Sequence, residues 1–397
     1  MKQQLNSVDI YILTRELNNL NKIRNIRVDK TYQIAEKELK IKINITNQGS
    51  KDLILAPNYL CVSEYPRPAP TKASSFAMQL RKHLKGGFIR EIGQHDFDRI
   101  VEIVIEKKEV KFILIAEFFS RGNVILCDEN KKIMGLLEWQ KWKDRKLGVN
   151  QIYEYPPKPA GVLNPLNVSQ TNFYEILTDP KIADKKLASI LAMELGIGGF
   201  YAEEICGISG LDKSKSADEL NDDEINVLFN NFNEFIEKLK NMETEPQVAL
   251  KSGDAEDVIP YKSETYAAPV FETKNYESFN AAVDEYFSKS ESERFSSEID
   301  KKFLDKLKKL ENRKKSQEEV IEKLKKKSED YKEYGELIYK NFRIVEKIRT
   351  IIHNAQKQGF NDKEIMKKIK DAQKAGMKEA EYIKNLRHTE LEIEIEG

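Results

Sequence analysis

The 397-residue sequence has few of the residues that build metal and disulfide sites. Its three cysteines, Cys61, Cys127 and Cys206, lie far apart, and its four histidines lack the spacing typical of metal ligands. This pattern predicts buried thiols in a reducing compartment and no metal site. The sequence also lacks a phosphate-binding loop and a nucleophile elbow. We therefore expect no catalytic residues, no cofactor and no enzymatic activity.

Long apolar runs and an excess of charge of one sign are missing as well. No stretch of 18 or more apolar residues occurs, and the first residues form no apolar signal segment. We expect a cytoplasmic protein with no membrane partner. The 66 basic and 66 acidic residues give a formal net charge of zero, so any surface that binds nucleic acid must be local.

The first 160 residues contain helical and strand-like patterns that predict an α+β domain built on an antiparallel meander. A helix is expected to begin at Ser7 as N-cap, with Asp9 in its first turn, and a second helix is expected over 75–84. Pro-rich residues 155–159 close the domain. Alternating or apolar runs predict strands over 39–45, 52–57, 60–62, 100–105, 110–119, 123–127 and 133–137.

Three further regions are expected after this domain. Residues 175–245 are predicted to be helical, with a helix-hairpin-helix in which Gly196, Gly198 and Gly199 allow a tight turn and expose amides to a backbone phosphate. Residues 246–297 are expected to be a connector.

Residues 298–397 are expected to be the first half of a long coiled-coil arm. A 4-3 spacing from 303 to 352 supports it, although several seam positions are not apolar, which favours an antiparallel partner. Self-association through this arm is one expectation. Residues 390–396 alternate like a strand that has just begun, so we expect a chain cut short.

Two short runs are candidate nucleic-acid contacts, each with a purely structural alternative. A basic helix over 79–90 carries Arg81, Lys82, Lys85 and Arg90, which can neutralise phosphates or merely form a solvated face. In the run 95–99, Asp98 and Arg99 can bind a base edge and a phosphate of an RNA loop, or form a structural ion pair. The structural alternative for Asp9 is that its negative charge stabilises the positive end of the helix dipole.

Six strings in chain order resemble the NFACT family, the group that includes NEMF and RqcH. The resemblance implies a first domain similar to the N-terminal domain of formamidopyrimidine-DNA glycosylases. It also implies a returning coil helix and a second RNA-binding domain, which we expect to be missing from a chain cut short. The strings are 7–11, 76–87, 97–101, 121–126, 278–287 and 335–341.

This resemblance also implies a function. Family members bind a large ribosomal subunit obstructed by peptidyl-tRNA and recruit aminoacyl-tRNA, typically alanyl-tRNA, for mRNA-independent tailing of the stalled peptide. On the family's pattern Asp9, Asp98 and Arg99 would engage tRNA, and we expect Arg81, Lys82 and Lys85 of the basic helix to add phosphate contacts. Peptide-bond chemistry would belong to the ribosome.

Two other classes of function are alternatives to this one. The Gly-rich hairpin also suits a structure-specific DNA-binding or repair protein. Glycosylase chemistry is not expected, because the chain begins Met1-Lys2 without an N-terminal proline, and its cysteines cannot build a zinc finger. A surface adhesin that binds fibronectin is disfavoured by the absence of a signal peptide and of a disulfide pattern.

Overall fold

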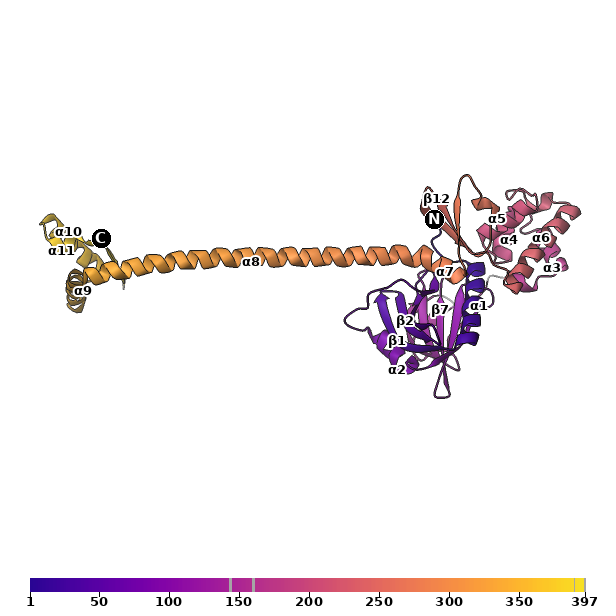
Figure 1. The fold of residues 1–397 in the computed structure, drawn as a ribbon, viewed down its shortest axis with the longest axis horizontal. Coiled ribbons are helices and arrows are strands. Elements are labelled where there is room, and N and C mark those ends of the chain that lie inside the picture. Colours follow the sequence, from indigo (N-terminus) through magenta and orange to yellow (C-terminus); the bar gives the residue numbers. More distant parts are fainter. Residues whose placement is uncertain (143–144, 159–160, 389, 396–397) are drawn as a thin grey trace. The chain divides into compact units, whose positions relative to one another are not determined.

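The computed structural model describes residues 1–142, 145–158, 161–388 and 390–395, without the side chains of residues 290–303. The chain divides into two compact units, Met1–Glu298 and Ile299–Gly397, which are described separately (Figure 1). None of the helices in the described part combines the length and hydrophobicity that crossing a bilayer requires.

A large antiparallel sheet, as expected, forms the base of the first unit. Its strand order is β4-β3-β2-β1-β5-β6-β7-β8-β9, two consecutive meanders that meet where Arg27 pairs with Phe88. Alternating apolar side chains explain most of the strands, because they give each strand a buried face. The strands are β1(Ile26–Ala35), β2(Glu38–Ile45), β3(Gly49–Leu55), β4(Leu60–Ser63), β5(Phe88–Gln94), β6(Ile100–Lys107), β7(Val110–Glu117), β8(Asn123–Asp128) and β9(Ile133–Leu136).

Two helices pack against this sheet, and each corrects a detail of the sequence analysis. In α1(Ser7–Arg24) the N-cap is Asn6 rather than Ser7, because Asn6 and Asp9 form a reciprocal capping box. Helix α2(Ser75–Leu84) ends before the predicted limit of the basic helix, so Arg90 lies on strand β5. The chain turns at Gly86, with φ +83°, and at Gly87, where a Cβ would lie 2.7 Å from Ile105.

The predicted helical region contains α3(Gln170–Thr178), α4(Leu187–Glu194), α5(Gly199–Ile208) and α6(Asp222–Asn241). The region expected to be a connector is folded instead. It forms a three-stranded sheet of β12(Gln247–Lys251), β13(Asp254–Ile259) and β14(Glu272–Asn275). Helix α7(Phe279–Val283) follows, and its Phe279, Ala282 and Val283 are fully buried, which anchors this segment in the core.

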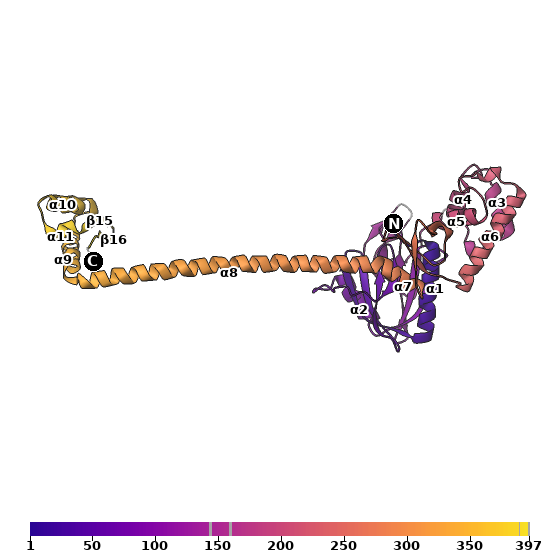
Figure 2. The same ribbon diagram turned by 45° about the horizontal axis from the view of Figure 1, so that its top comes forward.

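The second unit differs from the predicted continuous arm. Helix α8(Lys289–Lys340) is long, but most of its described apolar side chains, among them Leu310 and Leu324, are exposed, and no described helix pairs with it. The predicted seam breaks at Asn341, because Ile348 and Ile352 of α9(Phe342–Lys357) belong to a small separate core. Helices α10(Asp362–Lys374) and α11(Lys378–Glu381) and the hairpin β15(Ile383–Arg387)–β16(Glu390–Ile393) complete that core (Figure 2).

Candidate nucleic-acid interface

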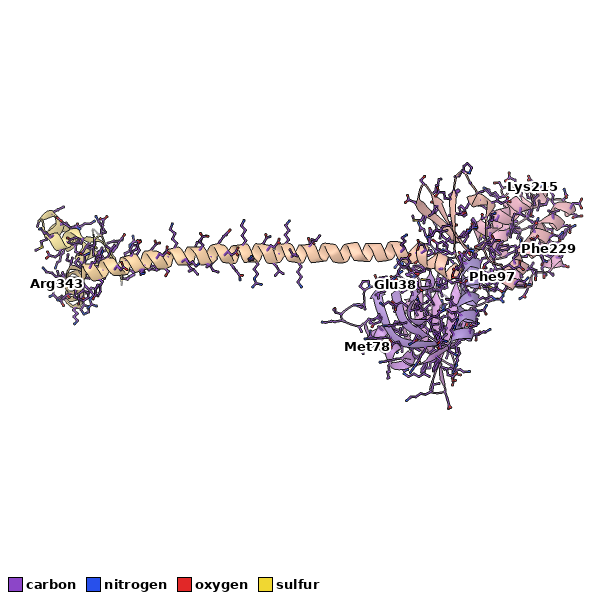
Figure 3. The ribbon with its side chains drawn as sticks, in the orientation of Figure 1. Glu38, Met78, Phe97, Lys215, Phe229 and Arg343 are labelled. Atoms are coloured by element: carbon purple, nitrogen blue, oxygen red, sulfur yellow. The ribbon has the colours of Figure 1, made fainter. Side chains whose placement is uncertain are left out.

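The turn between β5 and β6 holds the predicted Asp98–Arg99 pair. Two consecutive residues of this turn, Asp96 and Phe97, have positive φ angles of 42° and 59°, which side chains other than glycine seldom adopt. Burial of Phe97 stabilises this conformation, because its ring is 6% exposed and lies 5.5 Å from the ring of Tyr11. Figure 3 shows Phe97 where the sheet meets the helices of the same unit. Such strain is common at functional sites.

Backbone hydrogen bonds then fix the direction of the next two residues. The Asp98 amide donates to the His95 carbonyl at 2.8 Å, and the Phe118 amide donates to the Arg99 carbonyl at 2.8 Å. Oδ1 of Asp98 accepts the Arg99 amide at 2.7 Å. The structural ion pair that the sequence left open is not formed, since no guanidinium nitrogen of Arg99 lies within 4.0 Å of any carboxylate of the described residues. The charge of Arg99 is thus not neutralised within the described chain.

Asp98 and Arg99 share a cleft with the glycine-rich turn that joins α4 to α5. This cleft, of about 490 Å³, is also lined by Asn6, Gly196 and Gly198. Helix α5 begins at Gly199 after Gly198, which has φ +81° and supplies no side-chain cap. The first amides of α5 therefore have no side chain as hydrogen-bond acceptor and carry the positive end of the helix dipole. Two candidates predicted separately from the sequence thus lie at one cleft.

Lys158, which the sequence did not single out, closes one side of the cleft. Its Nζ lies 2.5 Å from Oδ2 of Asp96, and Asn164 donates to the other oxygen of Asp96 at 3.0 Å. The hydrogen bond from Lys158 lowers the pKa of Asp96 below its ordinary value. Since Lys158 is paired with Asp96, Arg99 is the cation of this cleft that has no ion-pair partner among the described residues.

Asp9 occupies a different position from the one expected of a tRNA contact. It is fully buried, and its carboxylate accepts hydrogen bonds from the Asn6 amide at 2.9 Å and from the Tyr201 hydroxyl at 2.8 Å. Lys2 lies 2.9 Å from the same carboxylate. A carboxylate without exposed surface cannot contact RNA in this conformation, which corrects the predicted role. Asp9 instead joins α1 to α5.

Lys2 extends this buried network to the three-stranded sheet. Its Nζ lies 3.1 Å from Asp257, which in turn accepts a hydrogen bond from Tyr266 at 2.7 Å. Although burial disfavours the charged form, Asp9 and Asp257 raise the pKa of Lys2 above its ordinary value. Lys2, Tyr201 and Asp257 had no distinguishing sequence pattern, because they come from segments that meet only in the fold.

The predicted basic cluster on α2 lies away from the cleft. It adjoins the first residue of β5, whereas Asp98 and Arg99 follow the last, and a strand of that length spans about 20 Å. Arg81 is partly engaged, because its Nε donates to the Thr31 carbonyl at 2.8 Å and its guanidinium lies 4.9 Å from the ring centre of Tyr32. The structure therefore does not place Arg81, Lys82 and Lys85 in one site with Arg99.

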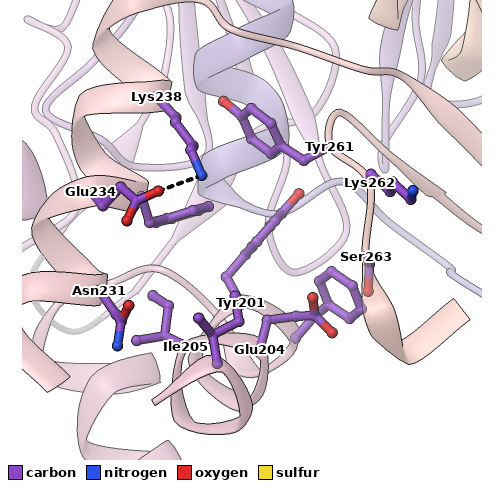
Figure 4. A pocket seen from close by; sticks show the side chains of 12 residues that line it. Tyr201, Glu204, Ile205, Asn231, Glu234, Lys238, Tyr261, Lys262 and Ser263 are labelled. Atoms are coloured by element: carbon purple, nitrogen blue, oxygen red, sulfur yellow. Dashed lines mark ion pairs between the residues drawn. The ribbon is translucent and has the colours of Figure 1, made fainter. Parts of the chain in front are cut away.

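A second pocket lies between α5, α6 and residues 261–263 (Figure 4). Four of its twelve lining residues are aromatic, and Lys238, which also lines it, lies 2.8 Å from Glu234. The hydroxyl of Tyr261 is buried and has no hydrogen-bond partner in the described part of the chain. At about 130 Å³ the pocket is too small for a nucleotide, so it is not a second candidate for the site. No group of His, Cys, Asp and Glu side chains among the described residues can hold a metal ion.

Comparison with known proteins identifies the family. The model of the NFACT N-terminal and middle domains matches residues 6–384, nearly the whole chain. The chain belongs to the NFACT family. The resemblance seen in the sequence is therefore confirmed.

Named relatives support this assignment. The chain is 32% identical over 366 residues to "Archaeal Rqc2 homolog aRqcH" of Methanocaldococcus jannaschii, a match that covers 90% of this chain and 53% of that protein. It is 27% identical over 377 residues to "Ribosome quality control complex subunit NEMF" of Mus musculus, covering 89% of this chain and 35% of that protein. The chain thus spans about half of the archaeal relative and a third of the mouse one.

A solved structure has a similar fold. The fibrinogen binding protein from Staphylococcus aureus superposes with a TM-score of 0.57 at 22% identity, covering 71% of this chain and 98% of that one. At this identity the match concerns the fold alone.

Proposed function

We propose that this chain is a ribosome quality control factor that engages tRNA at the cleft of Asp98, Arg99 and the α4–α5 turn. The names of the archaeal and mouse relatives support the biological role. The observation that carries the site is Arg99, a cation with no carboxylate partner among the described residues. It is held by a strained turn beside the first amides of α5, which no side chain caps.

The cleft offers complementary groups to an RNA backbone and to a base. The guanidinium of Arg99 suits a phosphate, and the first amides of α5 can hold a second one. Oδ1 of Asp98 is engaged by the Arg99 amide, which leaves Oδ2 to accept from a base amino group or a ribose 2′-hydroxyl. Asp9 acts as a positioning residue, because its bonds to Lys2 and Tyr201 hold α1 and α5 together below the cleft.

In this proposal the chain binds the large ribosomal subunit obstructed by peptidyl-tRNA and recruits aminoacyl-tRNA, with alanyl-tRNA as the expected species. The stalled peptide then receives a carboxy-terminal tail without mRNA. The protein supplies binding and positioning, and the ribosome supplies the peptide-bond chemistry. The basic cluster Arg81, Lys82 and Lys85 lies about 20 Å from the cleft, so we assign it to a separate stretch of RNA.

Cross-linking in cells tests this proposal. RNA bound to the intact chain is recovered and compared between wild type, Arg99→Ala and the control Lys213→Ala, whose charge is paired with exposed Glu203. We expect tRNA and large-subunit rRNA with wild type and control, and a selective loss of tRNA with Arg99→Ala. Equal tRNA recovery from all three proteins contradicts the assignment of the site.

A structure-specific DNA-binding activity is a second candidate, favoured by the tight glycine turn between α4 and α5. Competition separates the two functions. If duplex DNA displaces bound tRNA at equal or lower concentration, the DNA-binding function is preferred. If tRNA is retained against excess duplex, the quality control function is preferred.

A further inference from the structure

Both tryptophans of the sequence lie exposed on one short hairpin of the first unit. Trp139 is 59% exposed and Trp142 is 42% exposed, next to β10(Gln140–Lys141) and β11(Lys146–Leu147). Tryptophan is highly buried on average, because its large ring gains most from leaving water. Two exposed rings on a single hairpin therefore indicate a surface that a partner covers.

The root of this hairpin is fixed to the sheet. Arg145 is buried and forms an ion pair with Glu117 at the end of β7, and its Nε donates to the Glu154 carbonyl at 2.6 Å. Its guanidinium lies over Trp142, 5.5 Å from the ring centre, and 5.0 Å from that of Tyr153. Trp142 is thus supported on one side by a buried cation that an ion pair and a hydrogen bond hold in place.

Trp139 is supported in a comparable way. The side-chain amide of Asn123 donates to the Glu138 carbonyl at 2.9 Å and to Gln140 at 3.1 Å, which ties this segment to the start of β8. Gly148 leaves room for the indole, because a Cβ there would lie 3.1 Å from Nε1 of Trp139. Both rings are therefore exposed, while the backbone that carries them is fixed to the sheet by hydrogen bonds and packing.

The hairpin is rooted at the same end of the sheet as Arg99. Ile100, the residue after Arg99, pairs with Glu117, and Glu117 pairs with Asn123. Neighbouring strands lie about 4.8 Å apart, so the anchor points of the hairpin, Glu117 and Asn123, are roughly 5 and 10 Å from the backbone beside Arg99.

The charges around the rings favour one class of partner. Lys141, Lys146 and Arg121 are exposed. Of the nearby acids, Glu117 and Glu138 are engaged with Arg145 and Lys37, and Glu154 is exposed, so the exposed cations outnumber the exposed acid. Exposed aromatic rings among cations bind single-stranded nucleic acid, since bases stack on the rings while cations hold the phosphates. A base paired within a duplex cannot present its face in this way.

We propose that Trp139 and Trp142 form a stacking platform for unpaired nucleotides of the RNA whose backbone is held at Arg99. This proposal rests on the proposed tRNA-binding function and extends its site across the end of the sheet. It assigns the recognition of unpaired nucleotides to the hairpin and the anchoring of a phosphate to Arg99.

Fluorescence tests this directly, because all tryptophan emission of the intact chain comes from this hairpin. We expect a tRNA transcript and a single-stranded oligonucleotide to quench that emission, and a blunt RNA duplex of equal length to leave it unchanged. Trp142→Ala should weaken binding of single-stranded RNA about ten-fold, and Trp142→Phe should restore most of the affinity. Trp139→Ala should have a similar effect.

The variant Arg99→Ala separates this inference from the proposed function. One outcome overturns the platform alone: Arg99→Ala binds tRNA more weakly, the tryptophan variants bind RNA as the wild type does, and RNA does not quench the wild-type emission. Unchanged binding by Arg99→Ala with intact quenching overturns the Arg99 site and leaves the platform supported. Emission that responds only to RNA-free ribosomal proteins overturns the platform in favour of a protein partner. The emission of the wild type and the binding by Trp142→Phe keep the test decisive if an Ala variant fails to fold.

Discussion

The hydroxyl of Tyr201 donates a hydrogen bond of 2.8 Å to Oδ1 of Asp9. Both side chains are buried. Helix α5 follows the glycine turn that lines the cleft, and this buried hydrogen bond to a carboxylate joins it to α1. Burial and the neighbouring Asp9 raise the pKa of Tyr201 well above its ordinary value, so the hydroxyl keeps the proton that it donates. The position of the cleft's two walls therefore depends on this bond.

Tyr201→Phe removes that hydroxyl and leaves the ring. We expect a loss of about 1.5–3 kcal/mol in the free energy of unfolding, because a buried carboxylate loses a hydrogen-bond donor. Tyr261→Phe is the matched control, because its buried hydroxyl has no hydrogen-bond partner and its removal should cost little or stabilise the protein. Urea denaturation measures both. Equal losses in the two variants would show that the Tyr201–Asp9 bond contributes nothing specific.

Arg99→Ala should weaken tRNA binding and leave the melting temperature nearly unchanged. The loss of a charge-assisted contact costs about 1.5–3 kcal/mol, or roughly ten- to a hundred-fold in Kd, whereas an unpaired surface side chain changes stability by about 0.5 kcal/mol or less. The slope of log K against log salt should also become less steep, by about 0.7–0.9. Fluorescence anisotropy over a salt series measures both quantities.

Asp98 needs a milder substitution, because its Oδ1 accepts the Arg99 amide at 2.7 Å and Asp98→Ala would disturb the turn. Asp98→Asn can keep this acceptor while changing the charge offered to RNA. We expect weaker tRNA binding at an unchanged melting temperature. Wild-type affinity in both Asp98→Asn and Arg99→Ala would show that this pair does not bind tRNA. A lower melting temperature of Asp98→Asn would indicate that Asp98 has a structural role.

The sequence predicted the strands in which buried and exposed side chains alternate regularly. It missed strands in which this alternation is interrupted. Strands β2 and β6 through β9 were expected close to their observed bounds, and α2 at its observed bounds. Strands β1 and β5 were missed, because register shifts interrupt their pairing after Val28 and Ile89 and break the alternation of buried side chains. A bulge of this kind depends on the partner strand, which a local pattern does not contain.

The site was predicted in part for the same reason. Asp98 and Arg99 are adjacent in the sequence, and the glycines form a recognisable string, so both were found. Their convergence on one cleft was not predicted, nor was the burial of Asp9 by Lys2 and Tyr201. These relationships join segments far apart in the chain. In the second unit, spacing alone could not distinguish a coiled-coil seam from the separate core that contains Ile348 and Ile352.

Helix α8 carries exposed apolar residues that should cause self-association at high protein concentration. Leu310, Ile321 and Leu324 are 57%, 52% and 60% exposed, and a second copy can cover them by antiparallel pairing. We expect a concentration-dependent dimer in sedimentation equilibrium. The double substitution Ile321→Lys with Leu324→Lys should shift the chain to monomer, and Lys314→Ala should not. A monomer at all concentrations contradicts the prediction.

The turn that carries Asp98 and Arg99 should lose stability in acid because of His95. Its ring stacks on Tyr155, with centroids 3.4 Å apart, and burial lowers the pKa of His95 below its ordinary value of 6.5. The charges around it partly cancel, because Glu102 and Asp96 favour the protonated form while Lys131 and Lys158 oppose it.

The sign of the effect follows from the lowered pKa. Above pH 6.5 His95 is neutral in the folded and unfolded chain, and its contribution to stability is fully present. As the pH falls toward the lowered pKa, the unfolded chain takes up a proton that the folded chain still resists, so the free energy of unfolding decreases.

His95→Phe keeps an aromatic ring for the stack on Tyr155 but cannot be protonated. We therefore expect wild type to lose more stability than His95→Phe between about pH 7 and about pH 5, measured by urea denaturation without RNA. His83, whose pKa burial also lowers, is present in both proteins and cancels in this difference. If the stability of the two proteins changes with pH in parallel, His95 takes up its proton equally in the folded and unfolded chain. Acid would then not destabilise this turn through His95.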